Sequence, residues 1–202
     1  MNKLIMRIYP PLVPYDSAQR GISLIMVMLI LVVVSLLGIG SVQISIMSER
    51  GARNDRDQQV AWQAAEAGLI DAENDMLTAT SATRRAIFDG KTQKDFVTGC
   101  GASGDSIGLC SLALTGKQAW LTADFTATST NASTTPFGMF TGRIFTAGGV
   151  GIQPAKVPRY VIEVVPDPNG DKSDPTFIYR VTTMGFGPRT DIQAVLQMIY
   201  RI

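Results

Sequence analysis

The stretch ISLIMVMLILVVVSLLGIG, residues 22–40, decides the fold. Ser23 and Ser35 are its only polar side chains, and no charged residue occurs anywhere in 21–48. At about 1.5 Å per residue, a helix over 22–46 would be roughly 37 Å long, which is enough to cross a hydrocarbon layer of about 30 Å with some tilt. The sequence therefore predicts that this stretch is a membrane-spanning helix.

The segment before this helix is short and basic. Residues 1–21 carry Lys3, Arg7 and Arg20 against a single acidic residue, Asp16. A basic excess beside a membrane span stays in the cytoplasm, so we expect a single pass through a membrane with the rest of the chain on the side away from the cytoplasm. The apolar stretch is also longer than the core of about 7–15 residues that a secretory signal peptide has. Two interpretations remain: an uncleaved anchor, and a leader removed by a cut before the apolar stretch.

The junction between the leader and the apolar stretch carries a resemblance that supports the second interpretation, while the leader alone leaves both open. Arg20-Gly21-Ile22, followed by Ser-Leu-Ile, resembles the processing site of type IV prepilins. The resemblance implies that the prepilin peptidase cleaves after Gly21, removes residues 1–21 and methylates the new amino terminus at Ile22.

One residue departs from the usual prepilin pattern. The fifth mature position is normally a glutamate, thought to contact the terminal amine of a neighbouring subunit, and here it is Met26. An ionised carboxylate inside the membrane costs about 2.5–3.5 kcal/mol on insertion scales. Met26 is therefore more easily accommodated in lipid than a glutamate, but it cannot contact the terminal amine of a neighbouring subunit. Its presence favours a minor subunit over an abundant one.

Charged residues return at Glu49, and a helical pattern continues beyond the membrane. The sequence VAWQAAEAGLIDAE, residues 60–73, is rich in helix formers. Apolar residues at spacings of three and four predict one stripe along the helix, made of Trp62, Ala65, Leu69, Ala72 and Met76. We therefore expect a single helix over about 22–77, with 22–48 in the membrane or filament core and 49–80 as its continuation.

The order of residues in 49–67 carries a narrower resemblance. A Glu-Arg pair, Asn54, an Arg-Asp pair and the block Trp-Gln-Ala-Ala-Glu-Ala follow one another. This order resembles the helix of PilX-type minor pilins of the type IV pilus, which also lack the early glutamate. The resemblance covers 21–69 well and the last predicted strands loosely.

This resemblance implies a function and a set of partners. It implies a minor pilin that takes part in pilus assembly and priming, with adhesion or cell aggregation as a further role. The implied partners are other minor and major pilins, the prepilin peptidase and the inner membrane. The implied location is the inner membrane and then the pilus fibre.

The composition excludes several function classes. The chain of 202 residues has 18 basic and 17 acidic side chains and no histidine. This even balance gives no electrostatic footprint for nucleic acid. Without histidine, neither a Ser-His-Asp triad nor a histidine-zinc site can form from this chain alone. We expect no enzymatic activity, no cofactor and no nucleic-acid partner.

Residues 81–202 are expected to form a periplasmic β-rich domain. Three segments, 160–165, 177–183 and 193–202, alternate with period two and are rich in β-branched and aromatic residues. They predict an antiparallel sheet with one covered face, on which the apolar stripe of the helix packs. The predicted fold is therefore α+β and pilin-like, a long N-terminal helix, membrane-spanning in its first half, packed on a C-terminal antiparallel sheet.

Three features of the middle of the chain are read from composition. Cys100 and Cys110, the only cysteines, enclose nine residues and should form a disulfide outside the cytoplasm. The segment 122–135 is dominated by Thr, Ser and Ala, which predicts a polar loop with little core to offer. The glycines of 148–151 predict a loop and not a phosphate cradle, because no Walker lysine or helix start follows.

The loop 166–175 joins the first two predicted strands and has oxygen-bearing side chains at alternate positions. Asp167, Asn169 and Asp171 are spaced as at the start of a calcium loop, but Lys172 stands where an EF-hand has glycine. The same residue types are common in turns. Two interpretations stay open: a plain hairpin loop, which the composition favours, and a calcium site.

Two rival functions also stay open. A minor pseudopilin of type II secretion, of the K type, would also lack the glutamate, but it carries a larger inserted domain than the residues after the helix leave room for. A membrane-anchored periplasmic binding module would keep its leader. The mature amino terminus separates them, because a methylated Ile22 indicates a pilin and an intact Met1 indicates the anchor.

Overall fold

The computed structural model describes residues 22–129, 131–171 and 173–202. The leader predicted for 1–21 lies outside the described residues. The chain divides into two compact units, Met1–Arg50 and Gly51–Ile202, which are described separately. The elements in chain order are α1 (Ile22–Thr78), α2 (Ala82–Ala86), the 3-10 turn η1 (Gly104–Ser106), β1 (Leu109–Ser111), α3 (Ala119–Thr122), β2 (Thr135–Pro136), β3 (Arg159–Pro166), β4 (Phe177–Phe186) and β5 (Gln193–Tyr200).

The described part of the first unit is the beginning of α1. Every residue from Ile22 to Arg50 is helical. In a helix, the backbone N–H and C=O groups bond to one another within the same segment. A helix is therefore a stable conformation for an apolar segment even where no water can bond the backbone. The single helix predicted over about 22–77 is present as α1, Ile22–Thr78.

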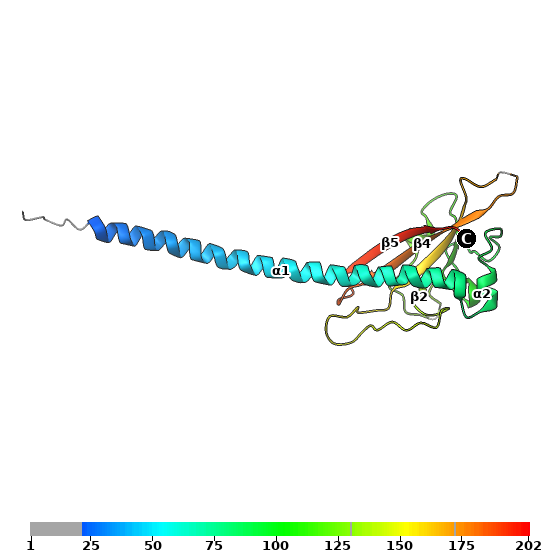
Figure 1. Cartoon of the computed structure of the whole chain (residues 1–202), viewed down its shortest axis with the longest axis horizontal. Coiled ribbons are helices and arrows are strands. Elements are labelled where there is room, and N and C mark those ends of the chain that lie inside the picture. The colour runs from blue at the N-terminus through cyan, green and yellow to red at the C-terminus, as the bar shows by residue number, and fades with distance from the viewer. Residues whose placement is uncertain (1–21, 130, 172) are drawn as a thin grey trace, which may run out of the picture. The chain divides into compact units, whose positions relative to one another are not determined.

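The second unit is a helix packed on a sheet. The strands lie in the order β1-β3-β4-β5, and β2 also pairs with β3. β3, β4 and β5 are antiparallel neighbours, whereas β1 runs parallel to β3. Figure 1 shows the part of α1 in this unit lying along the sheet, with α2 next to the end of the helix. The predicted α+β arrangement is confirmed, and the three predicted strands are β3, β4 and β5.

The main core lies between α1 and the sheet. Alternate residues of each strand face the helix, as the period of two predicts. Buried members of this core are Ala72 and Met76 from α1, Ile87, Phe88, Phe96 and Leu109 from the segment that follows, and Tyr160, Ile162, Val164, Tyr179 and Val181 from the sheet. Met198 and Tyr200 of β5 are partly buried against them.

Two glycines let α1 approach the sheet closely. A Cβ added to Gly185 of β4 would lie 2.2 Å from the backbone nitrogen of Ala65 and 2.3 Å from the carbonyl oxygen of Ala61. On the helix side, a Cβ on Gly68 would lie 2.3 Å from the hydroxyl oxygen of Thr183. The helix therefore meets β4 backbone to backbone, and only small residues fit between them.

This close approach corrects the predicted stripe at one position. Ala65, Ala72 and Met76 face the sheet, but Trp62 is 50% exposed. The indole of Trp62 donates a hydrogen bond to the carboxylate of Glu66 at 2.8 Å, on the outer side of the helix. A large ring has no room where alanines meet the sheet, so the stripe continues through Ala61 instead.

A second correction concerns the other face of the sheet. The sequence predicts one covered face, yet Val161 of β3 is fully buried on the opposite side. It packs there against Cys100, Cys110, Ala119 and Phe125. The segment 122–135 contributes Phe125 to this core and ends at the start of β2. The prediction of a polar loop with little core to offer was therefore wrong for four buried residues, Phe125, Ala132, Thr134 and Thr135.

Candidate functional site

The first unit presents an unpartnered apolar helix surface. All large apolar side chains from Ile22 to Met47 are between 46% and 72% exposed. Among the described residues, α1 is the one helix long and apolar enough to cross a membrane. The hydroxyls of Ser35 and Ser41 donate to carbonyl oxygens one turn earlier, at 2.7 and 2.9 Å, so they need no partner outside the helix. Such a surface is stable only against lipid or against other apolar helices.

The second unit holds a buried ion pair at the end of α1. The side chains of Asp75 on α1 and Arg84 on α2 are both 0% exposed. The Arg84 guanidinium donates from Nε to Asp75 Oδ1 at 3.1 Å and from Nη2 to Asp75 Oδ2 at 2.7 Å. This two-point contact fixes the direction of the guanidinium as well as its position.

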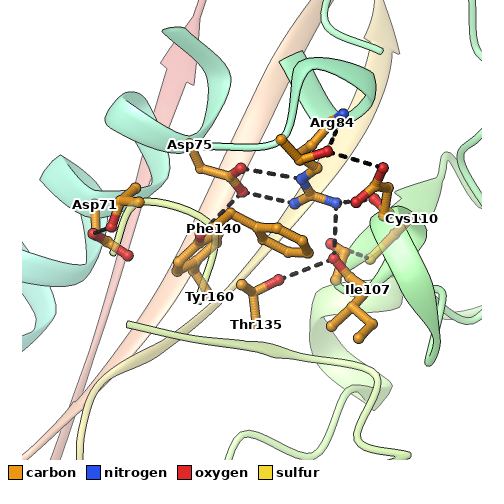
Figure 2. Close-up of polar contacts among 12 residues, drawn as sticks. Asp71, Asp75, Arg84, Ile107, Cys110, Thr135, Phe140 and Tyr160 are labelled. Carbon is orange, nitrogen blue, oxygen red and sulfur yellow. Dashed lines mark hydrogen bonds and ion pairs between the residues drawn. The ribbon is translucent and has the colours of Figure 1, made fainter. Parts of the chain in front are cut away.

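Figure 2 shows that the same guanidinium ties further parts of the chain together. Its Nη1 donates to the carbonyl oxygens of Asp105 and Ile107, in the segment that leads into β1. Its plane lies over the ring of Phe140, with 4.1 Å from Cζ to the ring centroid. From β3, the Tyr160 hydroxyl donates to Asp75 Oδ2 at 2.9 Å. Arg84 therefore joins α1, α2, the segment 105–107 and the loop of Phe140, and its partner Asp75 extends the cluster to β3.

Burial and charge shift the acidity of Tyr160. Removal of the phenol from water raises its pKa well above the ordinary value, and the neighbouring charge of Asp75 raises the pKa further. The Tyr160 hydroxyl therefore keeps its proton and remains a hydrogen-bond donor to Asp75. Its role here is to satisfy the carboxylate.

A second buried carboxylate lies one turn earlier on α1. Asp71 accepts from the backbone N–H of Gly138 at 2.7 Å and from the hydroxyl of Thr141 at 2.6 Å, and Arg143 Nη1 lies 3.9 Å from it. Burial raises the pKa of Asp71, although these hydrogen bonds and Arg143 oppose the rise. Asp71 therefore fastens the turn 138–143 to the helix.

The sequence carried a signal for this cluster that was missed. Asp71 and Asp75 are four residues apart, and Ala72 and Met76 follow them at the same spacing on the predicted apolar stripe. Charged residues on a buried stripe are almost always paired. The partner, Arg84, lies beyond the end of the helix, where periodicity gives no guidance.

The predicted processing site lies at the boundary between the residues that the structure describes and those that it does not. Arg20 and Gly21 lie outside the described residues, and Ile22 is the first residue of α1. The predicted disulfide between Cys100 and Cys110 is present. It lies in the core on the second face of the sheet, where it closes a loop that includes η1 and leads into β1.

The predicted calcium loop uses its carboxylates to close turns. Asp167 Oδ1 accepts from the backbone N–H of Asn169 at 2.9 Å and from Arg201 Nη2 at 2.8 Å. Asp171 Oδ1 accepts from the N–H and the hydroxyl of Ser173, at 2.9 and 2.7 Å, and these bonds lower the pKa of Asp171. Within the described ranges, no group of three or more His, Cys, Asp or Glu side chains is placed to hold a metal ion. This is the arrangement of a hairpin loop, and the calcium site stays a prediction.

The comparison with protein families agrees with both units. A model of the PilX N-terminal region matches residues 20–69, which include the apolar part of α1. A model described as type IV pilus assembly protein PilX C-term matches residues 50–202, which include the ion-pair cluster and the whole sheet. No curated protein and no solved structure matches the chain significantly. Because the second model alone covers most of the sequence, the chain belongs to the PilX family of type IV pilus assembly proteins.

Proposed function

We propose that this protein is a minor pilin. In this proposal the precursor sits in the inner membrane through α1, the prepilin peptidase cuts after Gly21, and the mature subunit starting at a methylated Ile22 enters the pilus. In this proposal the protein acts by packing against other subunits and catalyses no reaction itself. The peptide bond after Gly21 is cleaved by the peptidase. The observation that carries the proposal is the exposed apolar surface of α1 from Ile22 to Met47 in a chain of this family.

The energetics suit a subunit that moves from lipid to filament. Lipid tails are as apolar as leucine, so exchange of one for the other supplies little hydrophobic driving force. Transfer then depends on close packing between helices and on the assembly machinery. Met26, in place of the usual glutamate, removes the penalty of a buried carboxylate and also its contact with a neighbour. A subunit of this kind fits a special place in the fibre, such as the first, and a role in priming assembly follows from that place.

The proposal also divides the chain into four segments. We propose 1–21 as the cytoplasmic leader, 22–48 as the membrane and filament-core helix, 49–80 as its continuation and 81–202 as the periplasmic domain. The disulfide between Cys100 and Cys110 is in keeping with an oxidising compartment. Adhesion or aggregation through the outer domain is a further role in this proposal.

Mass spectrometry of the amino terminus tests the proposal. Sheared pili and membranes are collected from cells that express either the natural chain or a Gly21→Val variant. We expect methylated Ile22 at the terminus of the protein in pili, and the chain starting at Met1 confined to membranes in the variant. Ser41→Val, which changes the residue at the far end of the apolar stretch, is the matched control and should be processed normally. Met1 at the terminus of the natural protein would support the uncleaved anchor and overturn the minor-pilin proposal.

Gene deletion separates the pilus from a secretion system. Loss of this protein should reduce the number of surface pili, and restoration of the gene should return them. Normal piliation together with failed export of secreted enzymes would instead support the pseudopilin.

A further inference from the structure

Arg159, the first residue of β3, is a buried cation that makes no ion pair with any described residue. It is 8% exposed. Its Nε donates to the hydroxyl of Thr134 at 2.7 Å, and its Nη2 donates to the carbonyl oxygen of the same residue. In the ranges that the structure describes, no carboxylate lies within ion-pairing distance of Arg159, whereas the buried Arg84 is paired with Asp75.

This situation is unfavourable for a guanidinium. Burial of a charge is costly unless the charge is paired, because the charge loses its hydration. Burial lowers the pKa of Arg159, and attraction to Asp124 only partly opposes the effect. Both hydrogen bonds to Thr134 are to neutral oxygens, so the positive charge is compensated only in part, by Asp124 at a distance.

Arg159 borders a small pocket. A cavity of about 160 Å³ is lined by Arg159 and Thr134, by the hydroxyl residues Thr128 and Ser129, and by apolar residues that include Ile107 and Met139. Since the guanidinium is bonded to Thr134, it stands at the pocket wall, and its Nη1 makes no hydrogen bond with any described residue. The side-chain hydroxyls of Thr128 and Ser129 make none either within the described ranges.

We propose that this pocket binds a carboxylate group. The Nη1 of Arg159, which bonds no described residue, and the hydroxyls of Thr128 and Ser129 supply donor groups that suit the two oxygens and single negative charge of a carboxylate. The apolar part of the lining accommodates the carbon chain that bears it. The carboxylate comes from a small free acid or from an acidic side chain of another protein subunit, and the chemistry at the pocket is the same in both cases.

Nuclear magnetic resonance of the full-length protein in neutral detergent micelles tests the proposal. The protein is labelled with ¹⁵N-arginine, the Nε–H signal of Arg159 is assigned with the Arg159→Lys variant, and sodium acetate is titrated against sodium chloride at equal ionic strength. We expect a saturable shift of this signal with acetate, no shift with chloride, and an unmoved signal for Arg84. No saturable shift with acetate, or the same shift with chloride, would refute the carboxylate site.

Variants that leave Arg159 in place test the position of the site. The double variant Thr128→Ala/Ser129→Ala removes two exposed side chains whose hydroxyls bond no described residue. It should therefore fold normally and bind acetate about tenfold or more weakly, as loss of hydrogen bonds to a charged group predicts. Thr115→Ala, an exposed threonine outside the pocket, is the control and should bind like the natural protein. Equal acetate affinity in the double variant and the natural protein would place the site elsewhere and overturn the proposal.

The blocked tripeptide acetyl-Gly-Asp-Gly-amide separates the two sources of the carboxylate. Binding of the peptide about tenfold tighter than acetate would identify an acidic side chain of another subunit as the natural occupant. Binding of acetate as tightly as the peptide would identify a small free acid. Inorganic phosphate serves as the competing class, and a phosphate affinity above that of both carboxylates would reject carboxylate as the ligand.

Discussion

Substitution of Arg84 by methionine should strongly destabilise the second unit. Arg84→Met would leave the carboxylate of Asp75 buried, with the Tyr160 hydroxyl as its remaining donor. It would also remove the donor that serves the carbonyl oxygens of Asp105 and Ile107. Removal of one partner from a buried ion pair costs about 3–5 kcal/mol, because the other charge stays buried without compensation. The two carbonyl groups place the expected loss toward the upper end of that range.

The free energy of unfolding can be measured by urea titration of the full chain in neutral micelles. The signal is tryptophan fluorescence, because Trp62 and the partly buried Trp120 both belong to the second unit. Arg85→Met is a matched control, since Arg85 is the neighbouring residue on α2 and its side chain is exposed. The control should remain within about 0.5 kcal/mol of the natural protein.

A double variant distinguishes the loss of charge pairing from the loss of packing. Asp75→Leu/Arg84→Met removes both charges, and replacement of a whole buried pair by apolar residues is often neutral or favourable. We therefore expect the double variant to be more stable than Arg84→Met by at least about 1 kcal/mol. If Arg84→Met lost less than about 1 kcal/mol, or if the double variant were less stable than the single one, the ion pair would not be the anchor described above.

Three further predictions follow from the second unit. Gly185→Ala should cost about 3 kcal/mol or more, because its Cβ would overlap the helix backbone, whereas Gly51→Ala, with nothing within 4 Å, should stabilise the helix by up to about 1 kcal/mol; urea titration measures both. The raised pKa of Asp71 means that the folded state holds this proton more tightly than the unfolded state, so its contribution is fully present below the ordinary pKa of 3.8 and is lost as pH rises through the raised value. The stability of Asp71→Asn relative to the natural protein should therefore increase from pH 3.5 upward, and a difference independent of pH would contradict the assignment. Reduction of the disulfide, or replacement of Cys100 and Cys110 by serine, should lower the free energy of unfolding by about 2–3 kcal/mol, whereas dithiothreitol should leave the serine variant unchanged.

Much of the fold could be predicted because two periodicities are strong in this sequence. The apolar run from Ile22 and the spacing through Ala65, Ala72 and Met76 predict α1. Alternation in β3 predicts which residues face the helix, and Tyr160 and Ile162 are buried there as expected. These patterns are local in the sequence, so they can be recognised without knowing which segments pack against them.

The parts that could not be predicted depend on contacts between distant segments. β1 is three residues long and pairs in parallel with β3, which no local alternation signals. Burial of Val161 depends on Ala119 and Phe125 covering the second face of the sheet. Trp62 was assigned to the core by its spacing, yet Gly185 brings the sheet too close for an indole. The buried ion pair could not be predicted either, because Asp75 and Arg84 come together only after the chain turns beyond α1.

The small residues on α1 explain why a buried ion pair is needed at all. Between Ala61 and Ala72 the helix meets the sheet mainly through alanine, which buries little apolar area, and each buried methylene contributes only about 0.8 kcal/mol. The small residues thus allow α1 to lie close to the sheet, but they bury less hydrophobic area than larger side chains would. The bonds from Arg84 to Asp75, and from the turn 138–143 to Asp71, then supply the attachment that larger apolar side chains would give elsewhere. Loss of these bonds should therefore loosen α2 and the turn 138–143 from the part of α1 that lies in the second unit.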